Sequence, residues 1–312
     1  MNATDSTESP TKITASLLIP VYQDTTGLET TLNALARVGI PRPDAEVIVC
    51  NDAGGEAISR LATRYGVREV RLDENRGSYA ARNRGIDAAQ GNILVFLDAD
   101  QRVDEHWLDA GVRALEHADY AGGRIIVESG ANPTVWERYD VLKAFPVEHY
   151  IEHLHFAPTA NLFMRRAVFE RIGVFHETLR SGGDFELGQR VYAAGFVQVY
   201  APEAVTFHPA RNRAEQFKKI QRVATGQADV DCLILKKNPL FLLLIQLLVL
   251  AKIPFETVWR LIRCLTMLGG KTPESQTVFI IIEKTKKFYS HWYIAKRSMH
   301  YVMNSVVLKR CA

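Results

Sequence analysis

The chain has 312 residues, 47% hydrophobic and 23% charged, a balance that excludes wholesale disorder and allows a large buried core. Its four cysteines lack the paired spacing of a disulfide framework or a zinc finger, which fits a reducing compartment. The net charge of +3 is unevenly distributed along the chain. Residues 1–210 carry 20 basic and 29 acidic side chains, and residues 211–312 carry 18 basic and 6 acidic side chains. This asymmetry predicts an acidic body followed by a basic region that favours an anionic partner.

The first half alternates between apolar and amphipathic stretches. Residues 1–12 are polar and predict a flexible tail without a secretory signal. Apolar runs then predict strands at 13–22, 45–50, 67–72 and 93–97. Helices are expected between them, the first opened by a capping box of Thr26 and Glu29 and the third at 77–90. This β-α-β order predicts an α/β fold with parallel strands and right-handed crossovers.

The strand at 93–97 ends on two carboxylates, Asp98 and Asp100, separated by Ala99. Ligands of open α/β sheets collect beyond the carboxyl ends of the strands, and aspartates at i and i+2 of an extended segment point the same way. Such a pair can hold a divalent cation that bridges a diphosphate. A lone Asp-x-Asp is more often a solvated turn, so this interpretation depends on the rest of the chain.

Beyond Asp100 the pattern is less regular. We expect a helix at about 104–117, a strand at 120–128 and a short last strand at 201–207. His149, His153 and His155 have spacings found in zinc sites, but no carboxylate or cysteine motif surrounds them. A structural or acceptor-side role is therefore expected for these histidines.

From Pro239 the chain becomes strongly apolar, and Gln246 is the one polar residue in 240–251. A spanning helix needs about 20 apolar residues, so this stretch predicts a buried or an interfacial helix. Basic residues then alternate with apolar and aromatic ones in 253–268 and 284–297, a pattern typical of helices on anionic lipid. An ordinary packed helical extension is the alternative. Nucleic acid is not expected as a partner, because no recognised DNA- or RNA-binding motif accompanies the charge.

Three strand ends and the helix before the fourth strand carry an ordered series of motifs: Pro20-Val21-Tyr22, Asn51-Asp52, Ala81-Arg82-Asn83-Arg84 and Asp98-Ala99-Asp100. This series resembles the family 2 inverting glycosyltransferases, which have the GT-A fold, over about residues 13–210. The resemblance implies a Rossmann-like, mostly parallel central sheet flanked by helices. Residues 13–210 would then be the nucleotide-sugar-binding and catalytic domain, and residues 211–312 a helical, membrane-associated extension.

The same resemblance assigns roles to individual residues. Nucleotide binding is expected of one set: Pro20, Val21, Tyr22, Asp52, Arg82, Asp98 and Ala99. Asp100 and His208 match the family's ligands of Mn2+ or Mg2+. Asn51 departs from the family, because it replaces the first acid of an Asp-Asp pair, which leaves the identity of the base less certain.

The segment Ser181–Arg190 resembles the family's Glu-Asp-x-Asp-Leu-x-x-Arg motif, with Asp184 on the catalytic base. An inverting transfer is one in-line displacement, so the acceptor hydroxyl needs a base opposite the leaving diphosphate. Helix N-termini favour carboxylates in any protein, so a plain N-cap is the alternative for Asp184, and Glu186 is the fallback base. Asn161, Gly183 and Glu186 are expected near the donor sugar and the acceptor.

Other enzyme classes lack their motifs in this sequence. No Gly-x-Gly-x-x-Gly follows a strand, Tyr22–Thr25 stands where a nucleotidyltransferase needs a glycine-rich loop, and Gly270-Lys271-Thr272 lacks the earlier glycine of a P-loop. We therefore predict a metal-dependent glycosyltransferase (EC 2.4) that moves a single sugar from a UDP-sugar to a lipid-linked or polysaccharide acceptor. We place it at the cytoplasmic face of the membrane, in assembly of a cell-envelope glycan. A catalytically inactive scaffold of a glycan assembly complex is the alternative.

Overall fold

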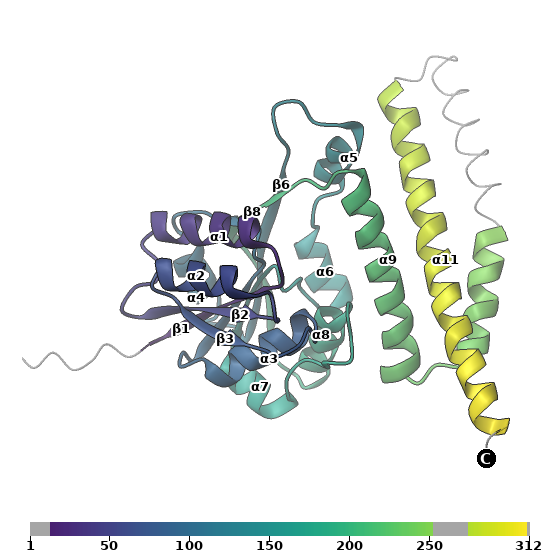
Figure 1. Cartoon of the computed structure of the whole chain (residues 1–312), viewed down its shortest axis with the longest axis horizontal. Coiled ribbons are helices and arrows are strands. Elements are labelled where there is room, and N and C mark those ends of the chain that lie inside the picture. Colours follow the sequence, from purple (N-terminus) through teal and green to yellow (C-terminus); the bar gives the residue numbers. More distant parts are fainter. Residues whose placement is uncertain (1–12, 252–273, 311–312) are drawn as a thin grey trace, which may run out of the picture. The chain divides into compact units, whose positions relative to one another are not determined.

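The computed structural model describes residues 13–251 and 274–310, without the side chains of 274–281 and 304–310 (Figure 1). The predictions made for residues 1–12, 253–268 and 270–272 lie outside this part. The chain forms two compact units. The sheet unit takes the residues up to Val127, Phe145–Glu177 and Asp184–Pro209, and the helical unit takes Glu128–Ala144, Thr178–Gly183 and the residues from Ala210 onward.

The sheet unit is built on one eight-stranded sheet of described residues, in the order β3-β2-β1-β4-β7-β6-β8-β5. Four strands are parallel: β1 (Ala15–Val21), β2 (Ala45–Asn51), β3 (Arg68–Arg71) and β4 (Ile93–Leu97). The other four are β5 (Arg102–Val103), β6 (Tyr120–Glu128), β7 (Asn161–Arg165) and β8 (Gln198–Pro209). In this half β7 is antiparallel to β4 and β6, and β5 is antiparallel to β8. The sheet is therefore mixed, with its parallel half where the apolar runs predicted it.

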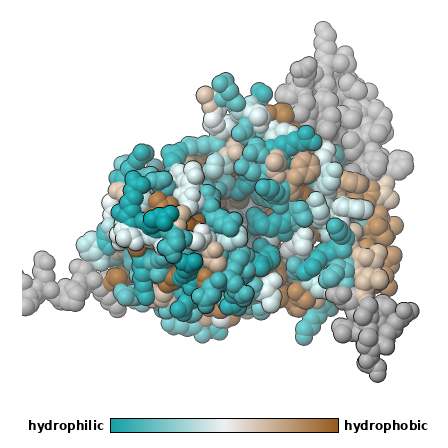
Figure 2. Space-filling view, in the orientation of Figure 1, coloured by the Kyte–Doolittle hydropathy of each residue, from teal (hydrophilic) through white to brown (hydrophobic). Residues whose placement is uncertain are grey.

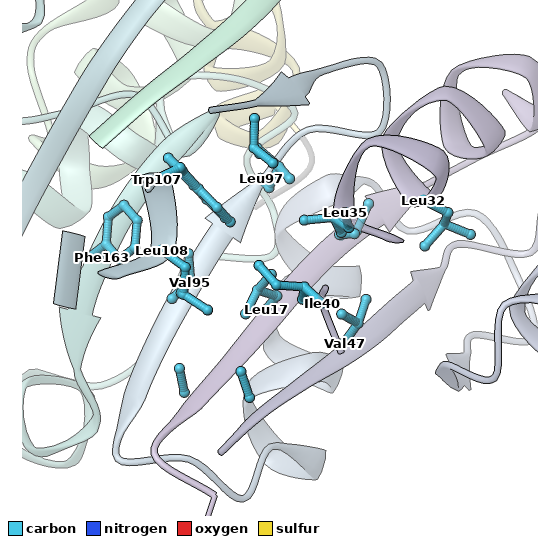
Figure 3. Close-up of a cluster of buried hydrophobic side chains, with 14 of the residues drawn as sticks. Leu17, Leu32, Leu35, Ile40, Val47, Val95, Leu97, Trp107, Leu108 and Phe163 are labelled. Carbon is cyan, nitrogen blue, oxygen red and sulfur yellow. The ribbon is translucent and has the colours of Figure 1, made fainter. Parts of the chain in front are cut away.

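The central strands are buried on both faces. Val47, Leu17, Val95 and Phe163 are register partners across β2, β1, β4 and β7, so they form one row on a single face of the sheet (Figure 3). Helices α1 (Thr25–Arg37), α2 (Glu56–Arg64) and α4 (Trp107–Ala114) contribute side chains to the core on this face. On the opposite face Phe96 packs against Phe169 of α7 (Arg166–Ile172) and against Phe175. Burial on both faces explains why these strands read as unbroken apolar runs.

The start of α1 differs from its prediction. Asp24 is the N-cap, and its side chain accepts a hydrogen bond from the Gly27 amide at 2.8 Å. Thr26 lies inside the first turn, so the capping box of Thr26 and Glu29 is wrong. Aspartate is as good a cap as threonine, and here it stands at the residue where the helix begins.

The remaining helices of the sheet unit are α3 (Ser78–Ala88), α6 (Val147–Leu154) and α8 (Gly183–Ala193), which begins at the unit boundary. α3 is the helix predicted at 77–90, and its bounds are nearly the same. The helix predicted at 104–117 is the shorter α4, and the last strand, predicted at 201–207, is the longer β8. β5 was not predicted, since two residues carry no periodic signal.

The helical unit contains α5 (Val135–Lys143), α9 (Arg213–Asp229), the π-helical turn η1 (Val230–Ile234), a helix at 239–251 and α11 (Glu274–Arg310). α9 and α11 lie side by side (Figure 1). Arg297 and Tyr301 of α11 both bond the buried carboxylate of Asp229, at 2.6 and 2.8 Å. Within the described part of the chain, no helix is both long enough and apolar enough to span a membrane. A helical C-terminal region is thus present, as predicted.

Candidate active site

Asp52 organises the loop that leads into α3. Its carboxylate follows β2, is buried, and accepts hydrogen bonds from the amides of Arg76 and Gly77, both at 2.8 Å. A helix start leaves amides without intrahelical partners, and a carboxylate bonds them strongly. Asp52 therefore ties the start of α3 to the end of β2.

Asn51 has a specific reason to be an amide. Its Oδ1 accepts from the Gly54 amide and its Nδ2 donates to Glu69 Oε1, both at 2.6 Å. An aspartate at this position could not donate and would place a second negative charge against Glu69. The departure of Asn51 from the family motif is thus matched by Glu69 on β3.

Arg82 and Asp98 form the central ion pair of the site. Arg82, on α3, is 4% exposed and donates from Nη2 to Asp98 Oδ1 at 2.7 Å, while the Asp98 side chain is 38% exposed. The guanidinium also lies over the Tyr79 ring, 5.8 Å from its centroid. The arginine is consequently held from two sides, and one side of Asp98 faces solvent.

Asp100 and His208 lie together because β5 pairs with β8. Phe207 is the register partner of Arg102, which brings His208 to the turn after β4. His208 is buried, its Nδ1 is 2.7 Å from the Pro209 carbonyl oxygen, and its Nε2 is 3.7 Å from Asp100 Oδ2. A proton on Nδ1 leaves the lone pair of Nε2 toward Asp100, which is the tautomer of a metal-binding histidine.

Asp100 and His208 can supply part of the ligand set of one hard divalent cation. Among the described residues no group of three or more His, Cys, Asp or Glu side chains converges on one point. Mg2+ and similar ions are commonly bound by one or two protein ligands and by the phosphate oxygens of a substrate. Asp100 and His208 therefore fit a cation whose other ligands would come from a diphosphate.

Asp184 lies in the first turn of α8 and faces aromatic side chains. Its Oδ1 is 3.4 Å from the hydroxyl of Tyr79, the residue that also underlies Arg82. Burial raises the pKa of Tyr150 on α6, and the negative charge of Asp184 raises it further. A contact series thus runs from Asp98 through Arg82 and Tyr79 to Asp184, and joins the strand-end acids to the start of α8.

Glu186 is paired. It is buried and accepts from Nε and Nη2 of Arg190 at 2.7 and 3.0 Å. Arg190 also donates to the carbonyls of Ile172 and Val174, at 2.7 and 2.8 Å. The pair therefore fastens the segment after α7 to α8.

Several sequence-predicted site residues lie apart from this series. Asn161 is in the interior of the sheet, where its amide bonds Trp107 Nε1 and the carbonyls of Arg124 and Ala204 at 2.8, 2.9 and 2.8 Å. This geometry gives Asn161 a role in joining β7 to α4, β6 and β8, and its side chain is buried. Gly183 opens α8 in the helical unit, and Tyr22, at the end of β1, is 46% exposed beside the buried Val21. Pro20 belongs to β1, one residue before Val21.

Two residues were missed from sequence. Gln101 is buried and accepts from the Asp98 amide at 3.3 Å, while its own backbone is bonded on both sides by Thr31 Oγ1. Tyr79 links Arg82 with Asp184. A polar residue directly after Asp-x-Asp could have indicated Gln101, but nothing local marks Tyr79 among the residues of α3.

Ala99 is buried in the turn after β4. Gly27 of α1 lets the Ala99 carbonyl approach closely, since a Cβ at Gly27 would lie 2.6 Å from the Ala99 carbonyl oxygen.

The sequence matches the family model for glycosyl transferase family 2 over residues 16–173. The chain belongs to this family. Glycosyltransferase AglE of Haloferax volcanii is 35% identical over 222 residues, which are 69% of this chain and 73% of AglE. Succinoglycan biosynthesis protein ExoO of Rhizobium meliloti is 31% identical over 182 residues, so the match spans about half of each protein, 52% and 51%. The predicted enzyme class, a glycosyltransferase, is confirmed.

Solved structures confirm the fold. The mannosyltransferase PcManGT from Pyrobaculum calidifontis, in complex with GDP-Man and Mn2+, is similar with a TM-score of 0.55 and 15% identity, over 96% of this chain and 79% of its own. TarS 1–349 of S. aureus, in complex with UDP-GlcNAc, is similar with a TM-score of 0.52 and 18% identity, over 68% and 64%. At these identities the likeness establishes the GT-A fold alone.

Proposed function

We propose that this family 2 glycosyltransferase is metal-dependent and inverting, and transfers one sugar from a UDP-sugar to a lipid-linked or polysaccharide acceptor. The observation that carries the proposal is the contact series from Asp98 through Arg82 and Tyr79 to Asp184. It connects groups suited to a diphosphate with a carboxylate suited to an acceptor hydroxyl. The bound UDP-GlcNAc and GDP-Man of the similar structures support a nucleotide-sugar donor.

On the donor side, Arg82 would bind the phosphates, since a guanidinium makes directed hydrogen bonds to phosphate oxygens. Asp100 and His208 would hold Mn2+ or Mg2+, and the Mn2+ in the PcManGT complex supports this cofactor. When bound, the cation neutralises charge that develops on the leaving diphosphate. Pro20, Val21, Tyr22 and Asp52 would lie by the nucleoside, at the ends of β1 and β2.

On the acceptor side, Asp184 is the proposed base. It takes the proton of the acceptor hydroxyl, whose oxygen forms the bond to the anomeric carbon as the bond to the diphosphate oxygen breaks. The diphosphate leaves with the electron pair, and attack from the opposite face inverts the anomeric centre. Glu186 is less suited, because both its oxygens bond Arg190. We assign Glu186 a positioning role.

Calorimetry tests the donor side. We expect UDP, rather than GDP, dTDP or CMP, to bind the full chain in the presence of Mn2+, and Asp100→Asn to weaken that binding at least tenfold, because an amide is a poorer ligand for a hard cation. Asp87→Asn, on the exposed side of α3, is the control and should bind as the wild type does. Absence of nucleotide binding under all conditions would favour the inactive scaffold instead.

We also propose that the helical unit attaches the enzyme to the cytoplasmic face of a membrane. The helix at 239–251 exposes a set of large apolar side chains: Leu240, Phe241, Leu244, Ile245, Leu247 and Leu248. Figure 2 shows apolar residues gathered over this helix. Lys236 and Lys237, just before it, are exposed. Exposed apolar side chains flanked by lysines suit an interfacial helix on anionic lipid.

Vesicle binding tests the attachment. The double variant Leu244→Asp/Leu248→Asp should lower partitioning onto phosphatidylglycerol vesicles at least tenfold, since burying each leucine contributes about 1.5–3 kcal/mol. Val197→Asp, which changes an exposed apolar residue of the sheet unit, is the control. Equal sedimentation of the double variant and the control with vesicles would refute the proposed attachment.

A further inference from the structure

A groove lies between α6 and β8, within the sheet unit. Its volume is about 690 Å³, which is in the range of pockets that bind small molecules. Its walls come from one face of α6, from the last turn of α8 and from the first residues of β8. None of the described residues that line it is a lysine or an arginine, and none belongs to the contact series of the proposed active site.

Aromatic rings form part of the wall. His155, one of three closely spaced histidines in the sequence, is the C-cap of α6 and lies in the left-handed region with φ 50°. A glycine would adopt this conformation without strain, but it would supply no ring. The His155 ring stacks on the Tyr192 ring, with centroids 3.6 Å apart and planes 3° from parallel. Tyr192 is still 54% exposed, so the ring pair offers a flat surface to a ligand.

Polar groups line the groove beside these rings. Glu148 and Glu152 are exposed and stand four residues apart, on one face of α6. Burial raises the pKa of the Tyr200 phenol, while Arg124 of β6 lowers it and Glu148 raises it. Tyr200 therefore keeps its proton at neutral pH. The carboxylates accept hydrogen bonds from hydroxyl groups, and the phenol can donate one.

Gln198 adds an unsatisfied acceptor to the wall of the groove. Its Nε2 donates to the Gly188 carbonyl at 2.9 Å, which fixes the direction of the amide. Its Oε1 is buried and has no hydrogen-bond partner among the described residues. An unsatisfied buried acceptor is unfavourable, and a hydroxyl group of a bound molecule would satisfy it.

The rings and the polar groups together fit a saccharide. A pyranose has C–H groups on its faces, which pack on the negative face of an aromatic ring, and hydroxyl groups on its edge, which bond carboxylates and amides. Two carboxylates, with no lysine or arginine in the lining, repel an anionic sugar. The chain belongs to a glycosyltransferase family, so saccharides are the molecules on which it acts.

The groove is separate from the proposed catalytic base. The charge of Asp184 acts on Tyr150, which lies about 200° around α6 from both Glu148 and Glu152. Tyr192 follows Asp184 by eight residues of α8, which places the two about 12 Å apart along the helix axis. A ligand of the groove therefore needs neither nucleotide nor cation, and a glycan needs several sugars to extend from the groove to Asp184.

We propose that this groove binds an uncharged oligosaccharide, the part of a polysaccharide acceptor that lies beyond the reacting end. The proposal rests on the proposed function, and it narrows the acceptor to a glycan of several neutral sugars. The Tyr192 ring, held against His155, packs on the face of a sugar. Glu148, Glu152 and Gln198 accept hydrogen bonds from its hydroxyl groups.

Titration of the full chain with neutral oligosaccharides tests the groove, followed by saturation-transfer NMR in EDTA and without nucleotide. The probes are maltohexaose, xylohexaose and mannohexaose. We expect at least one of them to bind the wild type at millimolar concentrations, and Tyr192→Ala to bind that probe at least tenfold more weakly. Tyr192→Phe keeps the ring and is the matched control, which should stay within about threefold of the wild type.

The charge of the groove gives a second test. Glu148→Gln should bind the neutral probe at least threefold more weakly, because a carboxylate accepts stronger hydrogen bonds than an amide does. Hexagalacturonate, an anionic oligosaccharide, should bind the wild type at least tenfold more weakly than the neutral probe, and Glu148→Gln should narrow this difference. Glu203→Gln, which changes an exposed carboxylate of β8 outside the groove, should behave as the wild type. Equal binding of the neutral and the anionic probe by the wild type would overturn the proposal.

Binding of UDP with Mn2+ separates this proposal from the proposed function, and it should be the same in the wild type and all these variants. Normal UDP binding by a wild type that binds none of the neutral probes would overturn the groove and leave the proposed function standing. Equal saccharide binding by Tyr192→Ala and the wild type would also overturn it. Saccharide binding without UDP binding would support the groove and refute the proposed donor. Binding of pentalysine, with no saccharide bound, would assign the groove to a cationic peptide instead.

Discussion

Asp184→Asn should lower the rate of sugar transfer by about 10²–10⁴-fold, the usual contribution of a general base. The substitution keeps the shape of the side chain and the hydrogen bond from the Phe185 amide, so the first turn of α8 should persist. The rate is measured as radiolabelled sugar transferred from the UDP-sugar to a lipid acceptor extracted from membranes.

Binding of UDP with Mn2+ is the control for Asp184→Asn. It should remain within about threefold of the wild type, because the proposed ligands of the diphosphate and its cation are Arg82, Asp100 and His208, and the substitution leaves all three side chains unchanged. If Asp184→Asn still transferred sugar at the wild-type rate, another group would have to be the base.

Glu186→Gln should produce the opposite result. We expect the free energy of unfolding to fall by about 2 kcal/mol, because a charge-assisted pair with the partly buried Arg190 becomes a neutral contact. Urea denaturation measures this loss. Transfer by the folded variant should fall less than tenfold, since Arg190 can still hold the segment after α7 through the carbonyls of Ile172 and Val174.

Glu170→Gln, which changes an exposed carboxylate of α7, is the matched control for stability and should stay within about 0.5 kcal/mol of the wild type. The two variants distinguish the carboxylates of α8. Asp184→Asn should lower the transfer rate without changing the free energy of unfolding, and Glu186→Gln should lower the free energy of unfolding more than the transfer rate. Loss of transfer in a stable Glu186→Gln protein would reverse these assignments.

The parallel half of the sheet was predictable from local pattern. Unbroken apolar runs at β1, β2 and β4, separated by helices, require burial on both faces, and parallel pairing is the arrangement that supplies it. The positions of Asp52 and Asp98 at strand ends follow directly, because the carboxyl ends of parallel strands meet at one edge. The departure from the family motif at Asn51 is explained only by its hydrogen bond to Glu69, which the sequence does not show.

The antiparallel half was decided by tertiary structure. The pairing of β5 with β8 brings His208 to Asp100, and the register of β4 with β7 puts Asn161 into the interior, where a site residue was expected. Likewise, whether Glu186 meets a substrate or Arg190 depends on where the segment after α7 lies.

The sequence by itself thus determined the family, the α/β order and the residues that end the parallel strands, because each depends on neighbours within a strand or a helical turn. The tertiary structure decided which distant side chains meet: His208 with Asp100, Tyr79 with Asp184, and Lys286 with Gln216. Such pairings follow from strand register and helix packing, which bring together residues far apart in the chain and leave no periodic signal in either segment.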